Sequence, residues 1–275
     1  MEDNDRLSVD AIAKIVKNGS TRKNAIVFQF SGLNQAECEA MINELKKNNV
    51  KFEVLVNGDN STTLLITSVD GEPENKKIKN ASDEKITPRR HGNWKNKNRG
   101  NDMWIPDGDH PLGKFNPDKK TLNNNIRAEL EKKINKHRKN NNMSEDFKFE
   151  GIMFNENEPD FLPFSFGDVD LNAYSSDRDI NYDMAYELMA KKLSKEKGKK
   201  YTAKDVENWM NNKNPKNDYE MQFTWHETPE GKMMKVPSVI HGNVSHTGGI
   251  NAMNKKGKEL YEQKNQRMNI NGPKE

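Results

Sequence analysis

Apolar and polar positions follow clear periods in residues 1–70, and the pattern predicts a small α+β domain there. A first helix is expected from Ser8, with the pair Asn18-Gly19 as its stop signal. A second helix is expected from Asn34 to about Lys47, because Glu37 follows Asn34 at the spacing of a capping box. Strands are expected at residues 25–30, 52–56 and 62–69, the last two as a hairpin.

The periodicity disappears between residues 71 and 120, where proline, glycine, asparagine and charged residues dominate. This segment is predicted to be a basic linker of low hydrophobicity. Its charge is concentrated in residues 75–100, which hold nine lysines or arginines against two acids. Residues 104–107 are the one patch in it that is expected to dock on another surface.

Helical spacing returns after residue 121, and residues 121–252 are predicted to form a second, mainly helical domain. Residues 155–166 are expected to be extended and packed on this domain, and residues 253–275 to form a polar tail. The predicted helices cover residues 122–137, a stretch around Tyr182 to Leu193, and a start at Thr202, where Asp205 completes a second capping box. The fold class expected for the whole chain is α+β.

Composition narrows the classes of protein that fit. Hydrophobic residues make up only 32% of the 275 residues, so small cores joined by solvated segments are expected. A single cysteine, Cys38, excludes an internal disulfide and a multi-cysteine zinc site. No apolar run approaches the roughly 18 residues of a membrane span, and the first residues lack the pattern of a signal peptide. A cytoplasmic location in the producing cell is expected.

One segment, residues 224–249, contains half of the chain's six histidines. His226 falls in a predicted strand at 221–227, a turn at 228–231 and a return strand at 232–236 follow, and Pro237 suits the start of a helix that Gly248-Gly249 would end. His241 and His246 are five residues apart and converge only if that helix ends between them. The order of strand, hairpin and helix then brings three imidazoles and the Glu227 carboxylate close to one point.

Imidazole and carboxylate ligands suit one divalent metal ion such as Mg, Mn, Ni or Zn. Three protein ligands with an open position are typical of a catalytic site. In phosphodiester hydrolysis, a neutral histidine can accept a proton from the attacking water while the metal offsets charge on the phosphate. The residues themselves therefore indicate metal-assisted hydrolysis.

The same segment resembles the core of HNH (ββα-metal) nucleases, specifically toxin nucleases of the HNH/endonuclease VII superfamily with a Trp-His-His or Trp-His-Glu signature. The matching residues are Trp225-His226, Met234-Lys235-Val236-Pro237, His241 and His246-Thr247-Gly248-Gly249. Weaker similarity extends to residues 158–161 and to Asp177-Arg178-Asp179 with Asn181. The resemblance implies an antibacterial toxin or effector with a ββα-metal core.

Two assignments of the site residues follow. Carried over by position, His226 would bind the metal and Glu227 would stand where these enzymes place the general base. An ordinary glutamate accepts a proton from water poorly, so the chemistry favours His226 as the base, with His241, His246 and Glu227 near the metal. Both assignments nominate the same four residues as catalytic or metal-binding.

Basic residues are the expected contacts for DNA phosphates, without reading of bases. The residues expected in this role are Arg89, Arg90, Lys95, Lys97, Arg99, Arg178, Lys191 and Lys192. A toxin implies a cognate immunity protein, and residues 1–70 would then serve delivery, by docking on a chaperone or a secretion apparatus. The alternatives are an RNase on the same fold and a non-catalytic nucleic-acid-binding protein with a structural metal.

Overall fold

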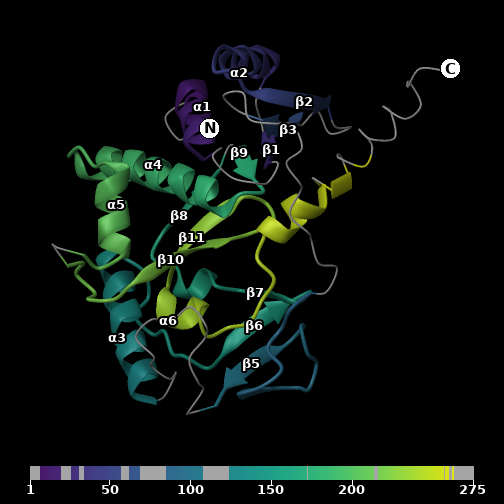
Figure 1. Cartoon of the computed structure of the whole chain (residues 1–275). Helices are drawn as coiled ribbons and strands as arrows, with labels where there is room; N and C mark the ends of the chain where they lie inside the picture. The colour runs from purple at the N-terminus through teal and green to yellow at the C-terminus, as the bar shows by residue number, and fades with distance from the viewer. Residues whose placement is uncertain are drawn as a thin grey trace.

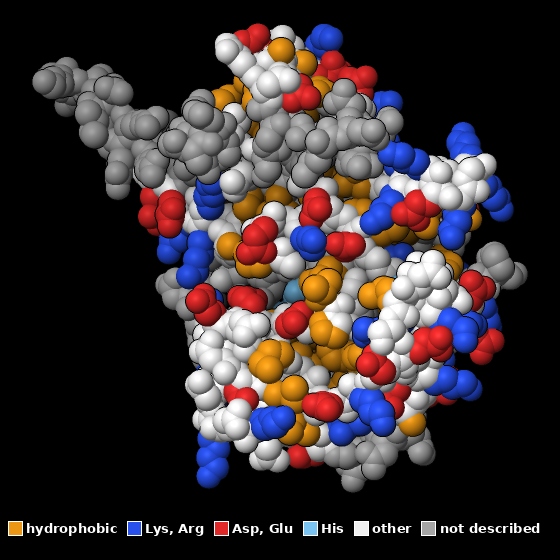
Figure 2. Space-filling model, turned by 180° about the vertical axis from the view of Figure 1, so that it is seen from behind, with side chains coloured by type: hydrophobic (Ala, Val, Ile, Leu, Met, Phe, Trp, Pro, Cys, Tyr) orange, Lys and Arg blue, Asp and Glu red, His pale blue; other side chains and the backbone are white. Residues whose placement is uncertain are grey.

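The computed structural model describes residues 7–19, 26–30, 34–56, 62–68, 85–107, 124–171, 173–213, 216–256, 258, 259 and 262. These residues form helices and antiparallel sheets, which confirms the α+β class. Within this part of the chain, no helix is long and apolar enough to cross a membrane. The face drawn in Figure 2 mixes lysine and arginine with aspartate and glutamate and carries no broad area of one sign.

The N-terminal elements form as their patterns predict. Helix α1 (Val9–Gly19) and helix α2 (Gln35–Lys47) pack together beside strands β1 (Ile26–Phe30), β2 (Lys51–Val56) and β3 (Thr62–Ser68) (Figure 1). Asn34 accepts a hydrogen bond from the Glu37 amide, and the Glu37 side chain accepts one from the Asn34 amide, both at 2.9 Å. This reciprocal capping box satisfies two amides that the first helical turn leaves unpaired.

The N-terminal sheet is completed from far along the chain. Its order is β2-β3-β1-β9, and strand β9 (Ala173–Ser175) pairs antiparallel with β1. Beyond the strands, the Val27 amide donates to the Ser176 hydroxyl at 2.9 Å, and the Ser176 amide donates to the Val27 carbonyl at 2.9 Å. Residues 1–70 therefore share a sheet with the segment that leads into helix α4 (Arg178–Lys197).

The prediction of a linker is wrong for residues 85–107. Strands β4 (Gly92–Trp94) and β5 (Met103–Pro106) join β6 (Ile152–Asn155) and β7 (Glu158–Pro159) in a four-stranded sheet. Buried apolar residues are few in 85–107, and the largest is Trp104, which pairs with Ile152 and is 1% exposed. So few apolar residues give no periodic signal. Residues 71–84 and 108–120 of the expected linker lie outside the described residues.

A third sheet has the order β10-β11-β8 and lies in the middle of the molecule in Figure 1. It contains the predicted hairpin, as β10 (Phe223–Glu227) and β11 (Lys232–Pro237), and β8 (Asp168–Asp170) pairs with β11. The surrounding helices are α3 (Asn124–Asn140), α4 and α5 (Ala203–Met210), and α5 begins at the capping box that Thr202 and Asp205 predict.

Two expectations about the C-terminal end are corrected. Helix α6 (Ser238–His241) is a single turn, so the helix from Pro237 does not reach Gly248-Gly249. Residues 250–256 form another helix, not a polar tail, and bury Met253 and Asn254. The two glycines thus precede a helix. Lys256 donates to the Gln29 side chain at 3.1 Å, which ties this helix to β1.

Candidate metal centre

His226 is held by the hairpin. Strand β10 pairs residue by residue with β11, and His226 lies opposite Met234. Successive side chains in a strand point to opposite faces, so His226 faces away from Trp225 and Glu227. The His226 side chain is 4% exposed, and its Nδ1 has no hydrogen-bond partner among the described residues. A buried ring nitrogen without a partner is costly unless it binds something else.

His241 and His246 lie on either side of a sharp bend. Helix α6 ends at His241, where the Gly242 amide donates to the Ser238 carbonyl at 2.9 Å and the Asn243 side chain donates to the Val239 carbonyl at 2.8 Å. The chain then reverses direction, and this brings His246 close to His241 although the two are five residues apart. His246 contacts the Val244 carbonyl through Nδ1 at 2.8 Å. This contact assigns the proton to Nδ1 and leaves the Nε2 lone pair open.

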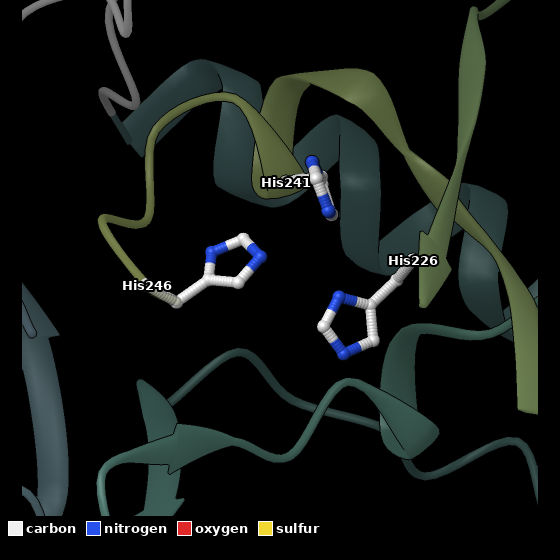
Figure 3. A group of neighbouring side chains, drawn as sticks. All are labelled: His226, His241 and His246. Atoms are coloured by element: carbon white, nitrogen blue, oxygen red, sulfur yellow. The ribbon is translucent and has the colours of Figure 1, made fainter. Parts of the chain in front are cut away.

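The three histidines come together in space. One ligand nitrogen from each of His226, His241 and His246 lies within 4.8 Å of the others, and Figure 3 shows the rings turned toward a common point. The ring centroids are 5.5 Å (His226–His241), 5.2 Å (His226–His246) and 4.7 Å (His241–His246) apart. Zinc binds histidine nitrogen at roughly 2.0–2.1 Å, so a bound ion requires only a modest closing of the rings.

Phe161 forms the wall behind this group. Its ring is fully buried and lies 4.7, 5.5 and 5.4 Å from the centroids of His226, His241 and His246. It lies two residues after β7 and precedes a 3-10 turn at Leu162–Phe164, so the segment 155–166 is packed on the domain as expected but is extended only in part. His241 and His246 are partly exposed, whereas His226 is buried.

Burial keeps the imidazoles neutral. It lowers the pKa of His226 to about 3, with smaller contributions from neighbouring His246 and from the positive charge of Arg178. Burial lowers the pKa of His241 well below its usual value, and it also lowers the pKa of His246. Metal ions bind neutral imidazole, so near pH 7 all three rings are in the form that a cation needs.

These observations fit a divalent metal ion. The donor set is three neutral nitrogens, one of them an orphaned buried Nδ1, at mutual distances that a small ion can bridge. No fourth histidine, cysteine, aspartate or glutamate in the described residues joins the group, so its geometry is that of an open site.

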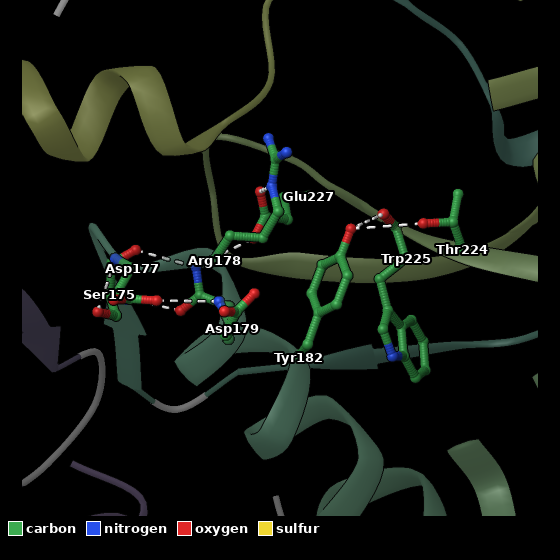
Figure 4. Close-up of polar contacts among 9 residues, drawn as sticks. Ser175, Asp177, Arg178, Asp179, Tyr182, Thr224, Trp225 and Glu227 are labelled. Atoms are coloured by element: carbon green, nitrogen blue, oxygen red, sulfur yellow. Dashed lines mark hydrogen bonds and ion pairs between the residues drawn. The ribbon is translucent and has the colours of Figure 1, made fainter. Parts of the chain in front are cut away.

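Glu227 lies outside this group, on the opposite face of β10. Its buried carboxylate accepts a hydrogen bond from Arg178 Nε at 3.3 Å and another from Asn181 Nδ2 at 3.2 Å (Figure 4). Burial raises the pKa of Glu227, and the contacts with Arg178 and Asn181 oppose that rise. The carboxylate is thus held by α4 and is turned away from the histidines.

Arg178 interacts both with Glu227 and with the three histidines. Its side chain is about half exposed (51%), and its charge acts on all three histidines as well as on Glu227. A Cβ added at Gly248 would lie 3.3 Å from Arg178 Nη2, so the guanidinium reaches the loop that carries His246. This places a fixed positive charge beside the three imidazoles.

Gly249 is required by close packing. A Cβ there would lie 2.6 Å from the Thr228 carbonyl group and 2.8 Å from the Tyr174 hydroxyl. The Gly249 amide donates to the Glu227 carbonyl at 3.2 Å, so the loop is closed onto the end of β10. Tyr174 contributes to this junction although no sequence pattern marks it, because its position depends on the pairing of β9 with β1.

The remaining basic candidates are spread over the molecule. Arg89 and Arg90 are exposed and line a cavity that also includes Asn243 and Ser245 from the histidine loop. Lys95 and Lys97 are exposed on the turn after β4, and Arg99 binds Thr87 through Nε at 2.8 Å. Lys191 and Lys192 are exposed on α4, about 20 Å along the helix axis from Arg178. Of these residues, Arg178, Arg89 and Arg90 lie beside the histidine loop.

Comparison with protein-family models finds no match, and searches of curated proteins and of solved structures find no similar protein. Any function for this site therefore has to be argued from its residues.

Proposed function

We propose that the protein is a divalent-metal-dependent endonuclease that hydrolyses phosphodiester bonds, with DNA of low sequence specificity as the substrate. The observation that supports this most is the convergence of His226, His241 and His246 from a β-hairpin, a helical turn and a loop. In this proposal β10, β11 and α6 are the ββα-metal core that the resemblance implies.

Each residue of the site has a separate role in this proposal. His226, His241 and His246 would hold the ion, which would supply a Lewis acid that offsets charge on the phosphate and on the leaving oxygen. Arg178 contacts the phosphate, because a half-exposed guanidinium beside the imidazoles matches phosphate geometry. Phe161 excludes water from the rear of the site.

Grouping His226 with the other two histidines favours it as a metal ligand. Carried over by position, the proton acceptor would then be Glu227, but its carboxylate lies on the other face of β10, against Arg178 and Asn181. The same placement argues against the competing assignment, with His226 as the base and Glu227 near the metal, so the role that the contacts of Glu227 support is to position Arg178.

The biological setting rests on the resemblance. We propose a toxin or effector that is delivered into target cells, with an immunity protein in the producing cell. An acidic immunity protein would complement Arg178, Arg89 and Arg90. Residues 1–70 would carry a docking surface for a chaperone or secretion apparatus, although their sheet is shared with β9.

The test is cleavage of purified plasmid, and separately of total RNA, with added Mg, Mn, Ni or Zn. We expect plasmid cutting by the wild type and a loss of at least about 100-fold in His226→Ala. The control is His137→Gln, because His137 packs on Phe166 at 4.4 Å, away from the metal-binding group. Near-normal cutting by His226→Ala, or no cutting with any of the four metals, contradicts the proposal. Cutting of RNA alone establishes the RNase alternative.

A further inference from the structure

A cavity of about 380 Å³ opens beside the histidine loop. One wall is the segment 86–91 with Trp104, and the other is formed by Asn243 and Ser245. These last two residues lie between His241 and His246 in the chain, so the cavity and the metal-binding group share one loop.

The two walls are joined by hydrogen bonds. The Ile86 amide donates to the Thr247 hydroxyl at 2.6 Å, one residue beyond His246. Behind that contact, Arg99 donates to the Thr87 hydroxyl at 2.8 Å, and Lys85 donates to the Glu156 carbonyl at 2.8 Å. Segment 85–91 is thus attached both to the histidine loop and to the β4-β5-β6-β7 sheet, so the cavity has a fixed position relative to the imidazoles.

The lining favours an anion. Arg89, Arg90 and His91 are exposed side chains at its edge, Asn243 and Ser245 add polar groups, and none of the described residues that line it is acidic. Two adjacent guanidinium groups suit phosphate oxygens, which they bind in bidentate fashion.

We infer that this cavity is a second anchoring site for the nucleic-acid strand. It holds a backbone phosphate a short distance along the strand from the bond next to the histidines, through Arg89 and Arg90. The placement of the scissile bond next to the histidines rests on the proposed function, whereas phosphate binding in the cavity needs no metal and no cleavage.

The test measures binding without cleavage. A short fluorescent DNA duplex is titrated with protein in the presence of EDTA, at salt concentrations between about 50 and 200 mM. The variant is Arg89→Gln with Arg90→Gln. The matched control is Lys191→Gln with Lys192→Gln, which removes the same charge from adjacent exposed positions on α4. Ser245→Asp, which adds a negative charge at an exposed wall residue and retains both arginines, is the second variant.

We expect the arginine pair to reduce the slope of log affinity against log salt by about 1.8, or about 0.9 for each lost phosphate contact. The lysine pair should change the slope by less than about 0.5. Ser245→Asp should weaken binding by about 10-fold in low salt. Equal effects of the two pairs indicate diffuse attraction and overturn the inference, as does unchanged binding in the arginine pair.

The outcomes separate this inference from the proposed function. A protein that binds through the arginine pair but cuts nothing retains the anchoring site without the nuclease. A protein that cuts plasmid while the arginine pair binds normally retains the nuclease without the anchoring site.

Discussion

Arg178 and Glu227 are joined by an ion pair of 3.3 Å that links the first turn of α4 to the end of β10, across 49 residues of sequence. Asn181, one turn further along the helix, donates to the other carboxylate oxygen at 3.2 Å. A buried carboxylate thereby fixes a half-exposed guanidinium next to three imidazoles. The pair supports a role for Glu227 in positioning Arg178, and the assignment by position would add a role as proton acceptor.

Glu227→Gln keeps the size of the side chain and removes its charge. If Glu227 accepts the proton, plasmid cutting should fall by about 100-fold or more, within the range typical of general bases. Metal affinity should change little, because Glu227 is not in the histidine group. Single-turnover cutting and calorimetric metal titration measure the two quantities. The control is Glu230→Gln, on the exposed turn of the same hairpin, which should cut normally.

His226→Ala separates the two assignments of this histidine. A ligand role predicts that metal affinity falls by at least about 10-fold to 100-fold together with cutting. A base role predicts lost cutting with metal affinity retained. Cobalt absorption spectra of the wild type and the variant measure the affinity directly. We expect the first result for two reasons. One ring nitrogen of His226 lies within 4.8 Å of the ligand nitrogens of His241 and His246, and its Nδ1 has no hydrogen-bond partner among the described residues.

Local patterns in the sequence predict local structure well. The capping boxes at Asn34 and Thr202 and the hairpin that carries His226 all form as expected, because each depends on neighbouring residues only. The three histidines were also predicted to converge, since a hairpin and a helix leave the chain few routes. Each of these elements is specified by residues that are close together in the sequence.

The relationships that depend on distant pairing were not predictable. Nothing in Ala173–Ser175 specifies β1 as its partner, because the backbone groups of an edge strand are the same for every sequence. Strands β4 and β5 were not predicted either, because the apolar residues around Trp104 are too few to show the period of a strand. The contact of Glu227 with Arg178 depends on both the strand face and the place of α4, so the spacing of residues in the sequence could not assign it.

Lys235 should lower stability at neutral pH. It is 6% exposed over Trp209, and burial lowers its pKa from 10.5 to about 8. Between pH 8 and pH 10.5, this lysine binds fewer protons in the folded protein than in the unfolded chain. The free energy of unfolding should therefore rise over that pH range. Lys235→Met should therefore stabilise the protein by about 1–3 kcal/mol at pH 7, less the lost cation–π contact.

Chemical denaturation at pH 7 and at about pH 10 measures this effect. The gain from Lys235→Met should shrink at the higher pH, where the wild-type lysine is becoming neutral in both states. A gain that is the same at both values would show that packing, not charge, accounts for it.

Phe161 should be the residue on which the histidine group depends for packing. Phe161→Ala should lower the free energy of unfolding by about 3–5 kcal/mol, as is typical of a fully buried phenylalanine. Leu162→Ala is the matched control, because that neighbour is 63% exposed. Urea denaturation of the two variants without added metal makes the comparison. Equal losses would mean that the wall behind the histidines does not support the fold.

Ser176 should couple the N-terminal sheet to the position of Arg178. Its hydroxyl accepts the Val27 amide at 2.9 Å, and Arg178 begins α4 two residues later. Ser176→Ala leaves that amide without its acceptor, at a cost of about 1–3 kcal/mol. The loosened junction should also move Arg178, so kcat for cutting should fall by several-fold while metal affinity is unchanged.

Ser194→Ala provides the comparison that isolates this effect. Ser194 lies on the same helix, accepts the Tyr201 amide at 2.9 Å, and stands about 24 Å along the axis from Arg178. Both variants lose one hydrogen-bond acceptor, so similar losses of stability are expected from them. Only Ser176→Ala should slow cutting. If both variants cut alike, the pairing of β1 with β9 supports the fold without positioning Arg178, and residues 1–70 have no direct part in the chemistry.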